Sequence, residues 1–166
     1  MNNMSKSKIY ISDAACRPLT EYLSGKGHNL VFAKDSLSTP IGCHPDIIYC
    51  HLGGGKVFHG DPMRLGPDYP ADCIHNACST GKFFIHNLKV TEHELLAAAE
   101  EFGLKKIHVS QGYARCSVLP VDENSIITYD RGIARACREQ EGPQVLLVRP
   151  GHVLLPGYDC GFIGGC

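Results

Sequence analysis

The sequence predicts an α/β fold of propeller type, built from repeated strand–strand–helix–strand units and incomplete at its C-terminal end. Four short stretches predict it, because each places polar or sulfur-bearing residues at the start of an apolar run. They read His44-Pro45-Asp46-Ile47-Ile48, Cys73-Ile74-His75-Asn76, Ala114-Arg115-Cys116-Ser117-Val118 and Gly157-Tyr158-Asp159-Cys160-Gly161-Phe162-Ile163. The second and third stretches are each followed by a β-like run, a helical run and a closing strand, a repeat of about 40 residues that is typical of propellers or arrays. In a ring of such units the polar openings would meet around one axis.

The composition is that of a single soluble domain over residues 1–166. Of the residues, 43% are hydrophobic and 20% are charged, and the formal net charge is -1. Binding to nucleic acid through phosphates needs basic clusters. The short ones here are Lys105-Lys106 and the series Arg131, Arg135 and Arg138, whose helical spacing predicts a solvated helix face. We therefore expect no nucleic-acid partner.

The N-terminal segment and the cysteines indicate a cytoplasmic protein. Residues 1–8 are polar and lack the apolar core of a signal peptide. No apolar run approaches the length of about 20 residues that spans a bilayer, so no membrane partner is expected. The nine cysteines are an odd number without the spacing of a disulfide scaffold. We expect most of them to be reduced thiols packed in the core.

The N-terminal part predicts strand, helix and strand. Residues 9–11 and 30–32 are extended apolar runs. Between them, Pro18 suits a first helical turn and Gly25 can end the helix. The predicted apolar face of this helix consists of Leu19, Tyr22 and Leu23. A loop rich in Ser, Thr, Pro and Gly follows at 36–42.

The first unit predicts a hairpin. Residues 47–52 form a strand, Gly53-Gly54-Gly55 the turn, and residues 56–59 the returning strand. Three glycines could also cradle a phosphate, but that chemistry needs a loop that leads into a helix N-terminus. Prolines at 62, 67 and 70 disfavour a long helix there, so the hairpin is the preferred interpretation.

The second unit, residues 73–111, contains the clearest predicted helix. A strand at 83–85 precedes it, and Thr91 with Glu94 forms the pattern of a capping box. The predicted stripe and stop of the helix are Leu95, Ala99 and Phe102, followed by Gly103. A strand at 106–109 closes the unit.

The third unit repeats this plan and the fourth begins it. Strands are predicted at 116–121 and 125–128, and Asp130 can cap a helix that ends at Gly142-Pro143. The buried face of that helix is predicted to carry Ile133, Ala134 and Cys137. Residues 145–148 are strongly β-like, and a last strand is predicted at 152–155, after which the unit lacks its helix and closing strand.

The repeated order resembles the pentein fold, the five-bladed α/β propeller of guanidine-modifying enzymes such as arginine deiminases, agmatine deiminases and dimethylarginine hydrolases, which a non-enzymatic ribosome anti-association factor shares. More narrowly, several phrases resemble those of an uncharacterised bacterial family of that fold group. They are His44-Pro45-Asp46-Ile47, His51-Leu52-Gly53-Gly54-Gly55-Lys56-Val57, Gly112-Tyr113-Ala114-Arg115-Cys116-Ser117, Ile126-Ile127-Thr128-Tyr129-Asp130 and the run 157–165. This narrow resemblance covers residues 40–166 and brings no established activity with it.

The resemblance implies a site at the axis of the ring. The enzymes attack an amidine carbon with a thiolate, use a histidine for proton transfer and bind the cation with carboxylates. On that pattern we expect Cys160 as nucleophile, His44 as acid–base group and Asp46 as cation binder, with His75, Cys116 and Asp159 as substrate-binding residues. The enzymes carry their nucleophile near the C-terminus of a complete ring, and the corresponding part is absent from this sequence. An incomplete ring would leave open strand edges, which favour a homo-oligomer.

Four of these residues also have a structural explanation. His44 could be a surface residue, Asp46 a turn cap, and Cys116 and Cys160 packed thiols. The Cys and His spacing lacks a Cys-x-x-Cys pair, so we expect no metal or other cofactor, although ligands distant in sequence could still assemble a zinc site. A Gly-x-Ser-x-Gly elbow is also absent. Two functions stay open: a cysteine-dependent hydrolase or transferase acting on a guanidino or amidine compound, and a non-catalytic binding or assembly module.

Overall fold

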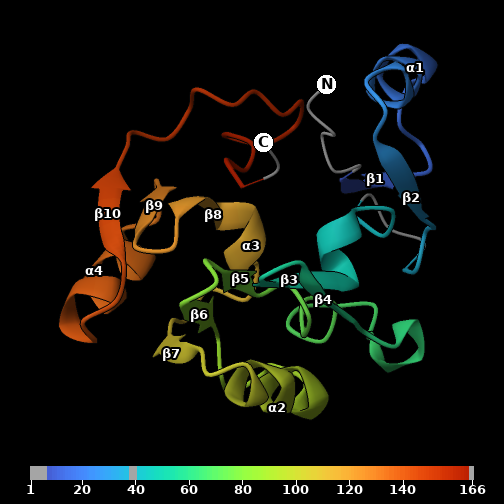
Figure 1. The fold of residues 1–166 in the computed structure, drawn as a ribbon. Coiled ribbons are helices and arrows are strands. Elements are labelled where there is room, and N and C mark those ends of the chain that lie inside the picture. Colours follow the sequence, from blue (N-terminus) through green and yellow to red (C-terminus); the bar gives the residue numbers. More distant parts are fainter. Residues whose placement is uncertain (1–6, 38–40, 165–166) are drawn as a thin grey trace, which may run out of the picture.

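The strands form four separate small sheets, which follow one another along an arc in the computed structural model (Figure 1). The structure describes residues 7–37 and 41–164. The first sheet pairs β1 (Lys8–Ser12) with β2 (Asn29–Ala33) in parallel, with helix α1 (Arg17–Gly25) between them in sequence. The second is an antiparallel hairpin of β3 (Tyr49–Gly53) and β4 (Lys56–His59).

The third and fourth sheets share one topology. In each, an antiparallel pair is followed by a helix and by a strand that pairs in parallel with the middle strand. The elements are β5 (Cys78–Ser79), β6 (Phe83–His86), α2 (His93–Glu101) and β7 (Lys105–His108), and then β8 (Val118–Asp122), β9 (Ser125–Thr128), α4 (Arg131–Glu139) and β10 (Gln144–Leu147). The predicted strand–strand–helix–strand order is therefore present twice.

Strand pairing does not close these sheets into a ring within the described residues. The described part of the chain is thus a mixed α/β protein with four small sheets and four helices. One of these helices, α3 (Ala114–Ser117), is short. Two short 3-10 helices, η1 (Pro45–Ile47) and η2 (Pro62–Arg64), flank the hairpin. None of the described helices is long and apolar enough to cross a membrane.

The core consists of two apolar clusters, which lie on opposite faces of β6. The first gathers side chains from the third and fourth sheets, namely Cys78, Phe83, Ile85, Ile107, Val109, Val118, Ile126, Ile133 and Cys137. The second joins the hairpin to α2 through Cys50, Leu52, Ala77, Phe84, Leu95, Ala99 and Leu104. Adjacent residues of β6 point into different clusters, as alternation along a strand requires. The two clusters hold the second, third and fourth sheets together.

Helix α4 has the predicted cap and faces. The Asp130 carboxylate accepts a hydrogen bond from the Ile133 amide at 2.9 Å. Its buried face carries Ile133, Ala134 and Cys137, and the three arginines Arg131, Arg135 and Arg138 lie on its exposed side. Both predictions for this helix are confirmed. The hairpin prediction is also confirmed, because Gly53, Gly54 and Gly55 all have positive φ and join β3 to β4.

The capping box predicted for α2 is wrong. The helix begins after Glu92, and no side chain caps it. The Thr91 hydroxyl instead lies 2.6 Å from His86 Nδ1 and donates to the Asn87 carbonyl at 2.9 Å. These buried partners compete with the helix amides for one hydroxyl. The predicted apolar stripe also stops one turn early, since Phe102 is exposed at the C-terminal cap, whereas Gly103 follows with φ 73° as predicted.

Helix α1 and both flanking strands form where predicted, but the helix buries no residue. Leu19 and Tyr22, two of its predicted core residues, are 44% and 61% exposed. This unit contacts the rest of the chain through β1, where the rings of Tyr10 and Tyr49 lie 4.6 Å apart. The first sheet is therefore the least buried of the four.

Two predicted strands begin later than expected, because short helices occupy their starts. Ile47 belongs to η1, where Pro45 fits the first turn, and β3 begins only at Tyr49. Cys116 likewise belongs to α3, and β8 begins at Val118. The strand predicted at 152–155 is wrong, since residues 148–164 contain no regular element.

The described cysteines are free thiols, as predicted, and most are packed in the core. Cys50, Cys73, Cys78, Cys116 and Cys137 are buried. Cys43 and Cys160 are half-buried and Cys16 is exposed. Cys166 lies outside the described residues.

Candidate functional site

Three of the four predicted openings meet at the side chain of Asn76, which is fully buried. Its Oδ1 accepts hydrogen bonds from the Arg115 amide at 3.0 Å and the Cys116 amide at 3.3 Å. Its Nδ2 donates to the Asp46 carbonyl at 3.1 Å and to Cys116 Sγ at 3.2 Å. One amide group thus connects η1, the start of β5 and α3.

Cys116 and Asp46 form the polar centre of this junction. The thiol donates to Asp46 Oδ2, with 3.1 Å between Sγ and the oxygen. Burial, followed by the negative charge and the hydrogen bond of Asp46, raises the pKa of Cys116 above its usual range. The thiol therefore stays protonated at neutral pH and acts as a hydrogen-bond donor rather than as a free thiolate.

A cavity of about 290 Å³ opens beside this centre. The residues that line it are Lys8, Ile9, Tyr10, Pro45, Asp46, Tyr49, His51, Ala77, Ser79 and Arg115. They come from the first three sheets or the residue before β5, from η1 and from α3. Oδ1 of Asp46 is buried and has no hydrogen-bond partner among the described residues. A ligand donor would satisfy this acceptor, which otherwise carries a desolvation cost.

Arg115 supplies the opposite charge in the cavity. Its Nη1 donates to the Val118 carbonyl at 3.1 Å and also to the carbonyl of Gly164. The Gly164 amide in turn donates to the Cys116 carbonyl at 2.7 Å. Partial burial and the charge of Arg115 lower the pKa of His51, so the ring of that histidine is neutral at pH 7. The chain therefore reaches the site directly after the fourth predicted stretch, at Gly164.

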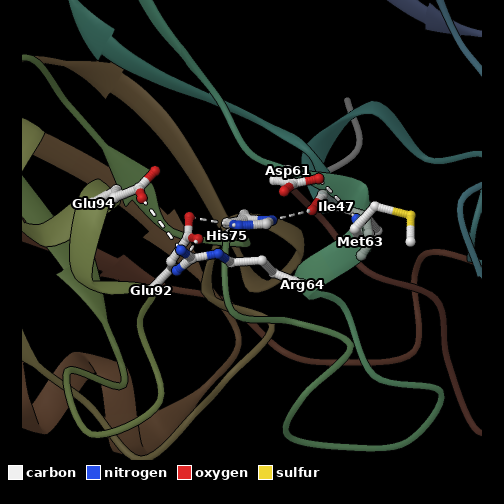
Figure 2. Close-up of polar contacts among 7 residues, drawn as sticks. All are labelled: Ile47, Asp61, Met63, Arg64, His75, Glu92 and Glu94. Carbon is white, nitrogen blue, oxygen red and sulfur yellow. Dashed lines mark hydrogen bonds and ion pairs between the residues drawn. The ribbon is translucent and has the colours of Figure 1, made fainter.

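His75 lies beneath the site and is completely buried (Figure 2). Its Nδ1 is 3.2 Å from the Ile47 carbonyl oxygen, and its Nε2 is 2.9 Å from Glu92 Oε2. Arg64 Nη1 lies 3.1 Å from the other oxygen of Glu92. The ring therefore links η1, which carries Asp46, to the residue that precedes α2.

The remaining predicted site residues lie elsewhere. His44 is exposed at the N-terminal cap of η1, and Asp159 is exposed in the irregular C-terminal segment. Cys160 is half-buried and close to Tyr129, whose pKa is raised by burial and then by neighbouring groups that include this thiol. None of the three lines the cavity. The structure thus brings Asp46 and Cys116 together, with His75 behind them.

Sequence reasoning assigned no site role to Lys8, His51 or Asn76. Asn76 lies in the second opening, and the expectation that the openings meet around one axis was a usable signal for it. Lys8 and His51 carry no such signal, since their place depends on how the sheets pack. No group of three or more His, Cys, Asp or Glu side chains in the described part of the chain could hold a metal ion.

The fold and the site define a mixed α/β protein with a charged cavity where its repeated openings meet. A family model matches residues 60–166, and the chain belongs to that family, described as a family of unknown function (DUF6873). The matched region includes Asn76, Arg115 and Cys116 and begins after Asp46. Neither the curated proteins nor the solved structures contain a match to this chain.

Proposed function

We propose that this protein is a binding module of the pentein type, and that its cavity takes a small guanidino or amidine ligand. The observation that carries the proposal is Asp46, which lines the cavity and whose buried Oδ1 has no hydrogen-bond partner among the described residues. A guanidinium presents donors in a planar fork that suits a carboxylate. Such a group would satisfy the free oxygen of Asp46 and neutralise its charge.

The pentein arrangement is supported by the two units of identical topology and by the meeting of their openings. In a propeller, the first strand of each unit lies at the axis. Here Ser79 of β5 donates to the Leu52 carbonyl of β3 at 3.2 Å, and Thr80 donates to the Glu123 carbonyl next to β8 at 2.9 Å. The first strands of three successive sheets, β3, β5 and β8, therefore contact one another near their C-terminal ends. The parallel unit β1–α1–β2 would correspond to the outer part of a further blade.

Two cations make the cavity selective. Lys8 and Arg115 line it together with Asp46. A simple monocation would gain one favourable contact and meet two like charges. A ligand that carries an acidic group beside its guanidino or amidine group would be matched at both ends.

Binding is favoured over catalysis by the state of the thiols. Cys116 is the thiol next to the cavity, and its raised pKa keeps it protonated at neutral pH. Cys160, the nucleophile expected from the resemblance, does not line the cavity. A nucleophilic thiol needs a nearby cation or base that favours the thiolate, and Asp46 acts in the opposite sense.

Calorimetric titration with arginine, agmatine and methylguanidine tests the proposal. We expect arginine, which has both charges, to bind best. Replacing Asp46 by Asn should weaken binding about 10–100-fold, the range that corresponds to loss of a hydrogen bond to a charged group. The matched control is Asp159→Asn, which changes an exposed carboxylate outside the cavity and should leave affinity unchanged. Equal affinity of the Asp46→Asn variant and the wild type would refute the proposed site.

Thiol chemistry at Cys116 is a second candidate, because a bound cation would offset the charge of Asp46 that helps to raise the thiol pKa. A haloacetamidine probe tests it. The sulfur displaces the halide and forms an S–C bond, while the thiol proton leaves to solvent. Rapid and selective labelling of Cys116, with iodoacetamide as control, would favour an enzyme. Slow labelling spread over several cysteines would leave the binding module as the function.

A further inference from the structure

We propose that the irregular segment 148–164 forms, together with the fourth sheet, a second binding site, which takes a small carboxylic acid with an apolar body. The inference does not depend on the guanidino ligand proposed above, because no residue lines both sites. It follows from two adjoining cavities, from the residues that line them and from two arginines without acidic partners.

The segment leaves the fourth sheet in a defined way. The Val148 amide donates to the Thr128 carbonyl at 3.0 Å, so the pairing of β10 continues for one residue. Pro150 has no amide hydrogen with which to continue it, and Gly151 turns the chain with φ 95°. From there the segment runs along the open side of the arc of sheets and then turns back (Figure 1).

The segment closes on itself between Val153 and Gly161. The Gly161 amide donates to the Val153 carbonyl at 2.7 Å. A Cβ at position 161 would lie 2.9 Å from Cγ1 of Val153, so this close return requires a glycine. Three residues later the Gly164 amide donates to the Cys116 carbonyl at 2.7 Å. The segment is therefore held at both ends, although it contains no regular element.

Two cavities, of about 250 Å³ and about 330 Å³, lie beside this segment. The residues common to both are Tyr129, Val148, Arg149 and Pro150. The smaller cavity is also lined by Gly151, His152, Val153, Gly161 and Ile163, and the larger one by Arg131 and Leu147. Small-molecule sites are mostly apolar, with few charged groups that fix the orientation of the ligand. The pair of cavities has this composition, and its size suits a small ligand.

The charge of the site is positive. Arg131 and Arg149 both line the larger cavity, and no acidic residue lines either one. Neither arginine forms an ion pair or a side-chain hydrogen bond with a described residue. The carboxylate of Asp130, which precedes Arg131, is occupied by the Ile133 amide and the Gln111 side chain. The two guanidinium groups are therefore available for a ligand carboxylate, whose oxygens suit their donors.

The smaller cavity determines what the rest of the ligand must be. Val148, Val153 and Ile163 give it an apolar wall, against which an apolar group would leave water. Tyr129 adds no negative charge, because burial, followed by neighbours that include Cys160, raises its pKa. The two arginines are exposed, and single contacts with exposed charges are weak. A bare anion would therefore bind poorly, and the apolar body must supply most of the affinity.

Amide NMR of the full chain with 4-phenylbutyrate as the probe tests the proposal. We expect saturable shifts for residues 129–131, 147–149, 151–153 and 161, and none for the cavity residues Tyr10 and His51. Acetate, which lacks the apolar body, and 4-phenylbutanol, which lacks the charge, should each bind about tenfold more weakly. The absence of saturable shifts at these amides would overturn the proposal, and so would equal binding of either analogue.

Arginine variants test the charged part of the site. Arg131→Gln and Arg149→Gln should each weaken binding of 4-phenylbutyrate about three- to fivefold, the range expected for exposed charges. The matched control is Arg135→Gln, which removes the same charge one turn further along α4 and outside both cavities. Its affinity should equal that of the wild type. An equal loss in Arg135→Gln and Arg149→Gln would assign the effect to the general charge of this surface and overturn the site.

Discussion

Cys116 donates its thiol hydrogen to the carboxylate of Asp46, a residue 70 positions earlier in the chain, with 3.1 Å between sulfur and oxygen. Asn76 contacts both residues from a third segment. The candidate site is thus assembled from three openings of the repeat, and the contacts that join these openings are all between residues distant in sequence.

The Asp46–Cys116 contact predicts how the thiol reacts. In the wild type we expect slow alkylation of Cys116 by iodoacetamide at pH 8, because burial and the Asp46 charge raise its pKa. Replacing Asp46 by Asn removes the charge and should increase the alkylation rate several-fold. Peptide mapping over time measures the rate, and the exposed Cys16 is an internal control that should react equally in both proteins. An unchanged rate at Cys116 would mean that access alone limits the reaction.

Truncation of the Asn76 side chain should cause a large loss of stability. Its truncation in Asn76→Ala leaves buried amide, carbonyl and thiol groups without their partner, and each buried unsatisfied polar group costs about 1–3 kcal/mol. We expect the free energy of unfolding, measured with urea, to fall by about 3 kcal/mol or more. The control is Asn124→Ala, which removes an exposed contact with Lys82 and should have an effect within about 0.5 kcal/mol.

A side chain at position 60 should clash with the His75 ring. A Cβ at position 60 would lie 2.5 Å from Nδ1 and Cε1 of His75. Because the ring is held on both sides, Gly60→Ala should destabilise the protein by about 1–3 kcal/mol, as overpacking does. The control is Gly25→Ala at the end of α1, where nothing lies within 4 Å and the change should be neutral or stabilising. Thermal unfolding of both variants measures the contrast, and a neutral Gly60→Ala would contradict the packing described for His75.

The buried ring of His86 should make the stability of the folded protein sensitive to acid. Burial lowers its pKa to about 4, whereas the unfolded chain has an ordinary histidine pKa of about 6.5. Between these values the unfolded state binds more protons, so stability is full above pH of about 6.5 and is lost as pH falls toward 4. The loss should be about 2 kcal/mol at pH 5 and about 3 kcal/mol near pH 4. Urea unfolding at pH 7 and pH 5 measures it, and His86→Phe should reduce the difference between the two values. An equal difference in the variant would assign the acid sensitivity to other groups.

The sequence predicted the parts of the fold that depend on local signals. The Gly53-Gly54-Gly55 turn and the Asp130 cap formed as expected because the residues that define them are neighbours in the chain. Thr91 showed an equally good local signal, yet its hydroxyl is occupied by His86 and Asn87. A buried tertiary partner outcompetes a helix amide, and sequence spacing does not reveal that partner.

The site was predictable only through the repeat. The openings of the repeat were expected to meet around one axis, and the structure brings Asp46 and Cys116 of two openings together. The pairing of His75 with Glu92 could not be predicted in the same way, because it depends on how the residue before α2 packs against η1. Cys160 was expected in the site but does not line the cavity. Its segment contains no regular element that would hold it there.

The contact between Tyr10 and Tyr49 has an optical consequence. The chain contains no tryptophan, so its near-ultraviolet emission comes from seven tyrosines. Two of these, Tyr10 and Tyr49, form a tilted pair in the wall of the cavity, and the His51 ring lies against Tyr10 with 5.3 Å between centroids. A molecule that enters would change the surroundings of both phenols at once. The protein therefore has its own fluorescent reporter of cavity occupancy, and compound libraries can be screened against the unlabelled chain.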